Sequence, residues 1–353
     1  MRDAFRAEVP DFVELTTVKN SVVGLLKELR YEHGKFWSWE AFCQVFSELD
    51  MNSSPGYPYC TMFANNRQFF GEKDGIFDSI RVYDFFEKVQ NRMSQFGEPD
   101  PIRLFVKPEP HKLDKINNQR YRLISSVALV DRFIDALLNR SLNKLIVEKW
   151  TETPILVGWT PVHGGWKIMH LLARMAADRS SFDWTVCGWL MELICEIRIA
   201  LCDNPAQIWI DLMRYRYKAL FGTPELVTSG GLVMRQLEDG VQKSGCYTTI
   251  TDNSIAQFVL HVLVCNRLKL PYGEFHVMGD DTLQSPQPPA YFAELAKFVK
   301  LKEVETKTSF CGFEFLREGV VEPSYVSKHA FRMLYARPKV LKEMAFSYSA
   351  LYH

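Results

Sequence analysis

The sequence lacks the features that would assign it to several specialised classes. Its eight cysteines form no C-x₂-C pair, and eight in 353 residues is too sparse for a disulfide scaffold. We therefore expect free thiols. The cysteines and histidines never follow a zinc-finger order, which argues against a structural zinc site.

Long hydrophobic runs are also missing. The most apolar stretch, IAQFVLHVLVC at 255–265, is shorter than the ~20 residues that span a bilayer. The first residues, MRDAFRAEVPDF, contain no apolar signal-peptide core. These absences predict a soluble, intracellular protein without a direct membrane anchor.

Net charge is absent too, but the charges are unevenly distributed. Forty-two basic residues balance 42 acidic ones, which argues against indiscriminate coating of nucleic acid. Residues 103–122 nevertheless carry six basic residues against two acidic ones, and residues 324–342 carry five basic residues and no acid. Such stretches are either solvated faces or, because Tyr and Phe are interspersed, parts of a groove that contacts phosphates.

Hydrophobic periodicity predicts an α+β fold. Apolar residues recur at helical spacing in four segments, at about 131–148, 186–202, 251–267 and 290–301. Strand-like runs occupy 103–107, 122–126, 274–278, 282–285 and 309–316. Helices that alternate with hairpin-like strand pairs favour α+β over a parallel α/β sheet.

The sharpest local signal is the segment EFHVMGDDTLQS at 274–285. An apolar run, Gly279-Asp280-Asp281 and a second short strand predict a tight hairpin with two carboxylates at its tip. A surface turn is the simpler interpretation, but the apolar flank favours carboxylates at an interior edge. Adjacent carboxylates repel each other unless a cation lies between them, and Mg²⁺ prefers such oxygen ligands.

A divalent-metal site needs a further carboxylate, and AADRSSFDWTVCGW at 176–189 offers two. Asp178 and Asp183 are expected at a strand end and in the following turn, both able to face one pocket. For Asp183, capping of the helix that begins near Val186 is an equally good interpretation.

A third polar segment, KSGCYTTITDNSIAQ, lies between these acidic sites at 243–257. Ser244-Gly245 predicts a flexible loop before a helix, and Thr249 and Asn253 fall four residues apart on one helical face. These residues are either helix caps or, if Asn253 faces Asp183, a hydrogen-bonding site for a sugar hydroxyl.

Together, these motifs resemble those of the viral RNA-dependent RNA polymerases. D-x₄-D, S-G-x₃-T-x₃-N and GDD follow the order of motifs A, B and C of that family. Lys107-x-Glu109 with Arg122-Leu-Ile is similar to motif F, SSPGYP at 53–58 to motif G, VKLKEVE to motif D and SFCGFEF to motif E. The ordered set spans residues 53–316, and GYPYC with FCGFEF resembles a plus-strand, sobemovirus-like lineage.

The resemblance implies a role for each matched residue. Two Mg²⁺ ions ~3.5–4 Å apart, for which Mn²⁺ can substitute, would be held by Asp178, Asp280 and Asp281. A lysine, either Lys300 or Lys302, would act as general acid toward pyrophosphate. The implied NTP-binding residues are Lys107, Lys115, Arg122, Asp183, Ser244, Thr249 and Asn253. The implied template-path residues are Ser53, Gly56, Pro58 and Gly245.

The resemblance also implies a right-hand architecture with an antiparallel-sheet palm flanked by helices. The expected fingers are 1–138 and 204–245, the palm is 139–203 and 246–316, and the thumb is 317–353. Because 353 − 281 = 72 residues follow Asp281, we expect either a reduced thumb or a fragment of a longer product. Expected partners are the RNA template, the nascent strand and NTPs, in replication complexes of the host-cell cytoplasm; a viral protein primer and other replication proteins are left open.

Two other functions fit parts of the pattern. A reverse transcriptase shares the chemistry, but Asn253 paired with Asp183 disfavours it because a DNA polymerase needs a bulky residue that excludes the 2′-hydroxyl. A non-catalytic RNA-binding assembly protein with incidental acidic turns predicts that Asp280→Asn leaves every activity unchanged.

Overall fold

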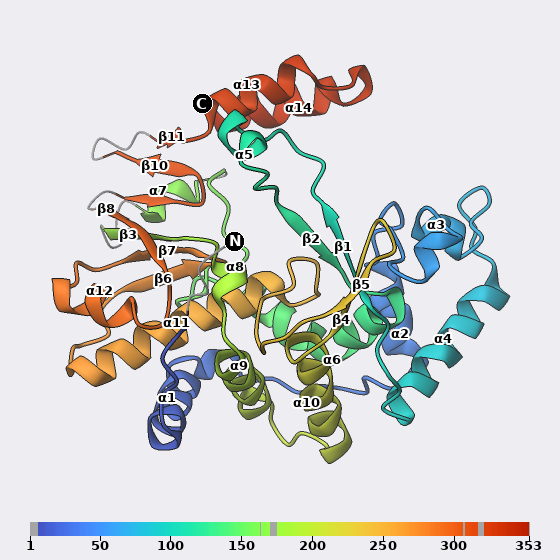
Figure 1. Cartoon of the computed structure of the whole chain (residues 1–353), viewed down its shortest axis with the longest axis horizontal. Coiled ribbons are helices and arrows are strands. Elements are labelled where there is room, and N and C mark those ends of the chain that lie inside the picture. Colours follow the sequence, from blue (N-terminus) through green and yellow to red (C-terminus); the bar gives the residue numbers. More distant parts are fainter. Residues whose placement is uncertain (1–5, 163, 170–174, 306–307, 317–320, 353) are drawn as a thin grey trace.

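Helices and small sheets alternate along the whole chain (Figure 1). The structure is a computed structural model that describes residues 6–162, 164–169, 175–305, 308–316 and 321–352. The described helices are α1 (Phe12–Leu25), α2 (Trp39–Ser47), α3 (Asn66–Phe69), α4 (Ser79–Ser94), α5 (Leu113–Asn117), α6 (Leu129–Glu148), α7 (Trp166–Met169), α8 (Phe182–Thr185), α9 (Gly188–Leu201), α10 (Gln207–Phe221), α11 (Thr249–Leu268), α12 (Pro289–Leu295), α13 (Val326–Leu334) and α14 (Pro338–Leu351). The described strands are β1 (Ile102–Val106), β2 (Leu123–Ser126), β3 (Met175–Arg179), β4 (Glu225–Thr228), β5 (Val233–Arg235), β6 (Phe275–Met278), β7 (Asp281–Gln284), β8 (Leu301–Glu305), β9 (Ser309–Phe310), β10 (Phe313–Phe315) and β11 (Val321–Pro323).

The mixed helix-and-sheet class predicted from periodicity is confirmed. Helices α6, α9 and α11 match three of the four predicted helical segments within three residues at each end. The fourth prediction, a helix over 290–301, is wrong in its second half. Helix α12 ends at Leu295, and Leu301–Glu305 instead forms β8, because its backbone pairs with β3 in a sheet.

A four-stranded sheet of order β6-β7-β3-β8 is antiparallel throughout. Ala177 pairs with Thr282, so position 178 in β3 and position 281 in β7 lie at neighbouring points of the sheet. The pairing of β3 with β8 shifts register between Asp178 and Arg179. The sheet therefore brings the D-x₄-D segment beside the GDD turn, although about 100 residues separate them in the sequence.

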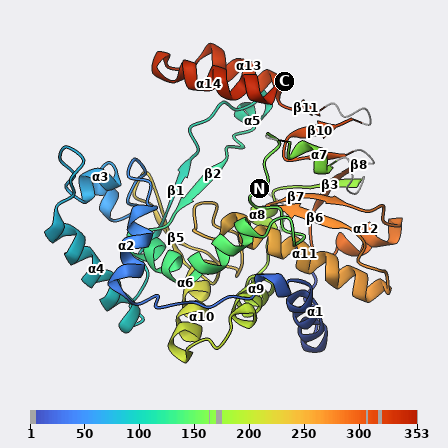
Figure 2. The same cartoon turned by 180° about the vertical axis from the view of Figure 1, so that it is seen from behind.

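Helix α11 forms the centre of the protein. Every residue from Thr251 to Cys265 is buried, so this helix has no solvent-facing stripe over most of its length. It packs against α1, α9, α12 and β6, and α11 and α12 lie on the same side of the β6-β7-β3-β8 sheet in both views (Figures 1 and 2). A buried helix whose N-terminal turn points at the GDD hairpin is a rigid support for a site.

A second sheet, of order β2-β1-β4-β5, contains the hairpin of β1 and β2. The hairpin leads to α5, which lies beside α13 in both views (Figures 1 and 2). The electrostatic effect of Lys328, on α13, on Glu109, in the loop after β1, supports this proximity. The two basic stretches, 103–122 and 324–342, therefore meet at one end of the molecule.

The cysteines and the long helices bear on two predictions, namely free thiols and the lack of a membrane-spanning segment. All eight cysteines are free, and four of them are buried, namely Cys195, Cys202, Cys246 and Cys265. Within the described ranges, no helix combines the length and the apolar character needed to cross a bilayer.

Candidate active site

The turn between β6 and β7 carries the two carboxylates of the GDD segment. Met278 pairs with Asp281 across the hairpin, which leaves Gly279 and Asp280 as the two central residues. Gly279 has a φ of 67°, the left-handed conformation that the first position of a type II′ turn requires and that glycine adopts without cost. The predicted tight hairpin is confirmed. The predicted interior edge is wrong, since Asp280 and Asp281 are exposed and only Gly279 is buried.

Asp178 is the third carboxylate of the predicted metal set. Its backbone lies in β3 next to β7, but its side chain lies outside the described residues. Among the side chains that are described, no group of three or more His, Cys, Asp or Glu residues could hold a metal ion. The donors that are described fit Mg²⁺ in kind, because Asp280 and Asp281 present carboxylate oxygens at an accessible turn.

Asp183 and Asn253 face each other, as the sugar-hydroxyl interpretation predicted. Asn253 Nδ2 donates to Asp183 Oδ1 over 2.8 Å, across 70 residues of sequence. Burial raises the pKa of the Asp183 carboxyl above its usual range, and the charge of Asp280 adds to this effect, while Asn253 and Arg122 oppose it. The pair is therefore electrostatically coupled to both the GDD turn and the basic hairpin.

The helix-cap interpretation of these residues is wrong. The N-cap of α9 is Cys187, the N-cap of α8 is Ser181, and Asp183 lies inside α8. Thr249 is the first residue of α11, and its hydroxyl donates to the carbonyl oxygens of Lys243 and Cys246, at 2.9 and 3.0 Å. Thr249 therefore fixes the preceding loop to the helix.

Helix α11 also holds the GDD turn directly, through a residue that the motif comparison did not single out. The Gly279 N–H donates to Ser254 Oγ over 2.8 Å, and the Ser254 hydroxyl in turn donates to the Ile250 carbonyl over 2.7 Å. Ser254 immediately follows Asn253. The sequence signal for this role was the position of Ser254 next to Asn253, the candidate sugar-binding residue. Its hydrogen-bond partner, the GDD turn, is decided by tertiary packing.

Strand β2 is a common scaffold for three predicted groups. Arg122 immediately precedes it, and the Ser244 hydroxyl donates to the Leu123 carbonyl over 3.2 Å and accepts from the Ser125 N–H over 3.3 Å. Gly245 lies so close to β2 that a Cβ atom would overlap the Ser125 carbonyl oxygen. The predicted flexible loop at Ser244-Gly245 is thus a partly buried segment packed on a strand.

The loop 53–58, which contains three of the predicted template-path residues, lies at the other end of the same strand. The Leu129 N–H donates to the Pro55 carbonyl over 2.9 Å. Gly56 lies so close to the backbone of Val127 and Ala128 that an added Cβ atom would overlap it. The Ser53 hydroxyl donates to the Asp50 carbonyl over 2.8 Å, and Pro58 directly precedes the short 3₁₀ turn Tyr59–Thr61. These positions belong to one loop anchored where β2 passes into α6.

Two basic residues of the predicted triphosphate site share one acid. Lys107 Nζ is 3.2 Å from Glu109 Oε2, and Arg122 Nη1 is 3.4 Å from Glu109 Oε1. Burial alone would raise the pKa of the Glu109 carboxyl, but Lys107, Arg122 and Lys328 hold it below its usual range. An ionised Glu109 therefore holds two cations next to each other where the paired strands β1 and β2 pass into their connecting loop.

The remaining lysines occupy different places. Lys115 is exposed on α5, at the tip of the hairpin, and none of the described contacts joins it to the other site residues. The Lys300 carbonyl accepts from the Ser180 N–H over 2.8 Å, and Lys302 is an exposed residue of β8. Lys302 is thus the unpaired residue of the β-bulge opposite Asp178 and Arg179, and Lys300 immediately precedes β8, rather than ending a helix as predicted.

Cys311 is a second residue that the motif comparison left without a role. It occupies the turn between β9 and β10 with a φ of 51°, and its side chain hydrogen-bonds to Asp281. Burial, followed by the charges of Asp281 and Asp280, raises the pKa of the Cys311 thiol far above its usual range. The thiol therefore stays protonated and donates to the GDD turn.

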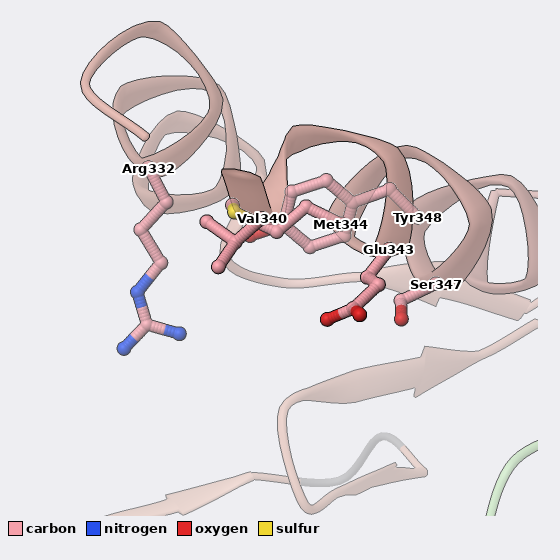
Figure 3. A pocket seen from close by; sticks show the side chains of 6 residues that line it. All are labelled: Arg332, Val340, Glu343, Met344, Ser347 and Tyr348. Atoms are coloured by element: carbon pink, nitrogen blue, oxygen red, sulfur yellow. The ribbon is translucent and has the colours of Figure 1, made fainter. Parts of the chain in front are cut away.

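Two hollows in the described structure lie apart from these groups. One, of about 440 Å³, lies between α13 and α14, where Arg332 and Glu343 point out from the same face (Figure 3). The other, of about 1000 Å³, is lined mainly by α9, α10 and the segments that flank them. No predicted site residue lines either hollow.

Comparison with known proteins finds the family that the motifs resemble. A family model for the viral RNA-dependent RNA polymerases matches residues 40–339. Protein P1-P2 of Potato leafroll virus (strain Potato/Scotland/strain 1/1984) is 30% identical over 335 residues, which cover 84% of this chain and 30% of that protein. Replicase polyprotein P2AB of Southern cowpea mosaic virus is 29% identical over 272 residues, or 70% of this chain and 28% of the polyprotein.

A shorter relative is covered more completely. The RNA-directed RNA polymerase of Mushroom bacilliform virus is 25% identical over 334 residues, which cover 86% of this chain and 78% of that protein. The chain spans only about 30% of the length of the Potato leafroll virus proteins that it matches. The expected likeness to plus-strand virus polymerases, including the sobemovirus type, is confirmed by these matches.

Proposed function

Because the chain belongs to the family of viral RNA-dependent RNA polymerases, we propose that it copies a viral RNA genome from NTPs on an RNA template. The observation that carries this proposal is the hydrogen bond between Asn253 and Asp183 beside the Asp280 turn. A polar pair that can bind a ribose hydroxyl, set next to carboxylates that can bind a metal, is what selection and joining of ribonucleotides require.

The carboxylates of the site fit a divalent cation. Asp178 and Asp280, assisted by Asp281, would hold two Mg²⁺ ions, whose chemistry when bound is to activate the attacking 3′-hydroxyl and to offset charge on the triphosphate. The protein's own contribution is to keep Asp280 and Asp281 in a fixed turn. Ser254 binds the backbone of this turn, and Cys311 binds the Asp281 side chain.

The other predicted residues take roles toward the nucleotide and the template. Arg122 and Lys107, held together by Glu109, would neutralise the triphosphate charge, and Lys115 at the hairpin tip would extend this basic surface. Ser244 and Thr249 would keep the segment before α11 in place for ribose recognition. The general acid toward pyrophosphate would be Lys300 or Lys302. Ser53, Gly56, Pro58 and Gly245 would line the template path along β2.

We assign the family's right-hand architecture on the same premise. The fingers would comprise 1–138 and 204–245, the palm 139–203 and 246–316, and the thumb 317–353. Helix α6 is continuous across residue 138, so fingers and palm would share this helix. The protein would bind RNA template, nascent strand and NTPs, and would act in replication complexes of the host-cell cytoplasm.

Primer extension on an RNA template tests the function. The intact protein should incorporate ribonucleotides only when Mg²⁺ or Mn²⁺ is present, and Asp280→Asn should reduce incorporation to background because a neutral amide is a poor ligand for Mg²⁺. Asp84→Asn, an exposed carboxylate on α4, is the matched control and should keep full activity. A folded wild type without metal-dependent extension, or an Asp280→Asn protein with wild-type rate, would contradict the proposal. Extension with deoxynucleotides preferred would instead indicate a reverse transcriptase.

A further inference from the structure

A fully buried ion pair lies on the back of the first turn of α11. Arg198 Nε donates to Asp252 Oδ1 over 2.8 Å, and neither side chain has any exposed surface. The Tyr217 hydroxyl donates to Asp252 Oδ1 and Oδ2, at 2.9 and 3.1 Å. Asp252 thus receives hydrogen bonds from two other helices, α9 and α10.

Both terminal nitrogens of Arg198 also have hydrogen-bond partners. Its Nη2 donates to Thr251 Oγ1 over 2.7 Å, and its Nη1 donates to Asn143 Oδ1 over 3.0 Å. The Thr251 hydroxyl is itself 3.0 Å from Asn143 Oδ1. Four helices, α6, α9, α10 and α11, therefore meet around one guanidinium group.

Net stability is a weak explanation for such a cluster. Burying two charges carries a desolvation cost that roughly cancels their attraction, and well-packed apolar residues of similar volume often serve a fold equally well. Apolar contacts, unlike hydrogen bonds, depend little on the orientation of the groups that make them. Hydrogen bonds from Arg198 and Tyr217 fix the rotation of the helix turn that carries Asp252, whereas packed methyl groups tolerate small rotations.

The residues next to Asp252 are the ones that contact the site. Asn253 binds Asp183, and Ser254 binds the Gly279 N–H at the GDD turn. Successive residues of a helix are rotated by about 100°, so fixing Asp252 on one side fixes the direction of Asn253 on another. Asp183 lies in α8, and a two-residue link joins α8 to α9, which carries Arg198. The ion pair of Arg198 with Asp252 therefore connects the segment that carries Asp183 to the helix that carries Asn253.

We propose that Arg198, Asp252 and Tyr217 are positioning residues that set the rotation of α11 and thereby the selectivity for ribonucleotides. The proposal rests on the proposed function, since it assigns ribose recognition to Asn253 and Asp183. Neither Arg198 nor Tyr217 touches the nucleotide. They act through Asp252 on the two residues that follow it.

The test replaces the directional contacts with apolar residues of similar volume. In the triple variant Arg198→Met, Asp252→Leu, Tyr217→Phe, no member of the trio is left as a buried charge or an unpaired hydroxyl, so the fold is expected to persist. Thr251 and Asn143 keep their mutual hydrogen bond. Leu263→Ala, a buried residue in the C-terminal half of α11, is the control for loss of stability without change at the first turn.

The preference for ribo- over deoxyribonucleotides is the first readout. We expect it to fall about tenfold in the triple variant, the equivalent of about one net hydrogen bond, with a higher KM for the ribonucleotide. Leu263→Ala should lower Tm but keep the preference of the wild type. A folded triple variant with unchanged preference would overturn the positioning role while leaving the proposed function intact.

Hydrogen exchange of the Gly279 amide gives a readout that does not need activity. Its bond to Ser254 protects it in the wild type, and we expect faster exchange in the triple variant than in a Leu263→Ala protein of equal or lower Tm. Equal protection in both variants would overturn the inference even if the wild type showed no polymerase activity. If the wild type shows no extension, the proposed function and the selectivity assigned here both fail, whereas faster Gly279 exchange in the triple variant would still support the positioning of α11 by the trio.

Discussion

At the scale of single residues, the site depends on side chains that are polar but largely enclosed. Asn253 is buried and Asp183 is partly buried, and each is the other's hydrogen-bond partner. If a ribose hydroxyl binds here, as proposed, it meets a donor and an acceptor that are already oriented. A deoxynucleotide would lack the hydroxyl that makes these additional hydrogen bonds, so it would gain less binding free energy at this site.

Asp183→Ala should therefore erode discrimination against deoxynucleotides. The loss of one hydrogen bond to a charged group corresponds to about 1.5–3 kcal/mol, or roughly 10- to 100-fold in the ratio of kcat/KM values. Thr185→Ala in the same short helix is the control, because the Thr185 hydroxyl contacts only backbone carbonyls. Equal discrimination by Asp183→Ala and the wild type would remove Asp183 from ribose recognition.

His261, in the buried middle of α11, is expected to affect the pH dependence of folding. Its Nε2 faces the Tyr272 carbonyl at 2.9 Å, so this nitrogen carries the proton, and its Nδ1 accepts from the Tyr291 hydroxyl at 2.8 Å. Both nitrogens are satisfied in the neutral form. Burial lowers the pKa of His261 to about 4.

The unfolded chain should therefore bind more protons at this residue than the folded protein between pH about 6.5 and about 4. In that window, falling pH should cost up to about 3 kcal/mol of the free energy of unfolding through His261. His261→Gln cannot titrate, so urea denaturation at several pH values should show a shallower loss than in the wild type. Parallel curves for the two proteins would contradict this assignment.

At the scale of elements, strand β2 and helix α11 organise the site. Strand β2 has Arg122 before it, Ser244 and Gly245 against its middle and the 53–58 loop at its end. Helix α11 carries Asn253, the proposed ribose-recognition residue, and contacts the GDD turn on one side, and it contributes to the Arg198 cluster on the other. The residues proposed to bind the NTP and the template thus share two supporting elements.

Gly245→Ala tests the contact between the loop and β2. The added Cβ would overlap the Ser125 carbonyl oxygen, so the loop must move away from the strand, and overpacking of this kind costs about 1–3 kcal/mol. Gly24→Ala in α1 is the matched control, because no atom lies within 4 Å of its Cβ position. Alanine is also favoured over glycine in a helix. Chemical denaturation should show destabilisation only for Gly245→Ala; equal stability of the two variants would contradict the close packing.

At the scale of the whole molecule, the net charge of zero results from acidic and basic residues that are unevenly distributed over the protein. The carboxylates of the candidate site lie at the β6–β7 turn and at Asp183, whereas the basic stretches 103–122 and 324–342 meet where α5 lies beside α13 (Figures 1 and 2). A neutral protein can therefore bind RNA along one basic surface. Its affinity is expected to fall steeply with salt, because bound phosphates release counterions.

The double variant Lys115→Ala, Arg332→Ala removes one exposed cation from each basic stretch. If both contact phosphates, the slope of log K against log salt should become shallower by about 1.4–1.8. Lys27→Ala with Lys269→Ala is the control, since these exposed lysines lie outside both stretches. The measurement is RNA binding by fluorescence anisotropy at several salt concentrations. An unchanged slope in the first variant would show that these stretches are only solvated faces.

The sequence by itself determined the local chemistry. Apolar periodicity identified α6, α9 and α11, and the order of short polar motifs was sufficient to indicate the family, since motif residues and their spacing are local properties. The GDD hairpin was also predictable because a glycine between an apolar run and polar residues favours a tight turn.

Only the tertiary structure decided which of these residues meet. The end of α12 depended on the pairing of Leu301–Glu305 with β3, and the role of Asp183 depended on Asn253, 70 residues away. Arg198 carried no motif signal that distinguishes it from an ordinary helix residue, and the motifs that contain or adjoin Cys311 and Ser254 did not show what these two residues contact. Their partners lie across elements that pack only in the folded chain, and burial there turns an ordinary hydroxyl, thiol or guanidinium into a fixed, directional contact.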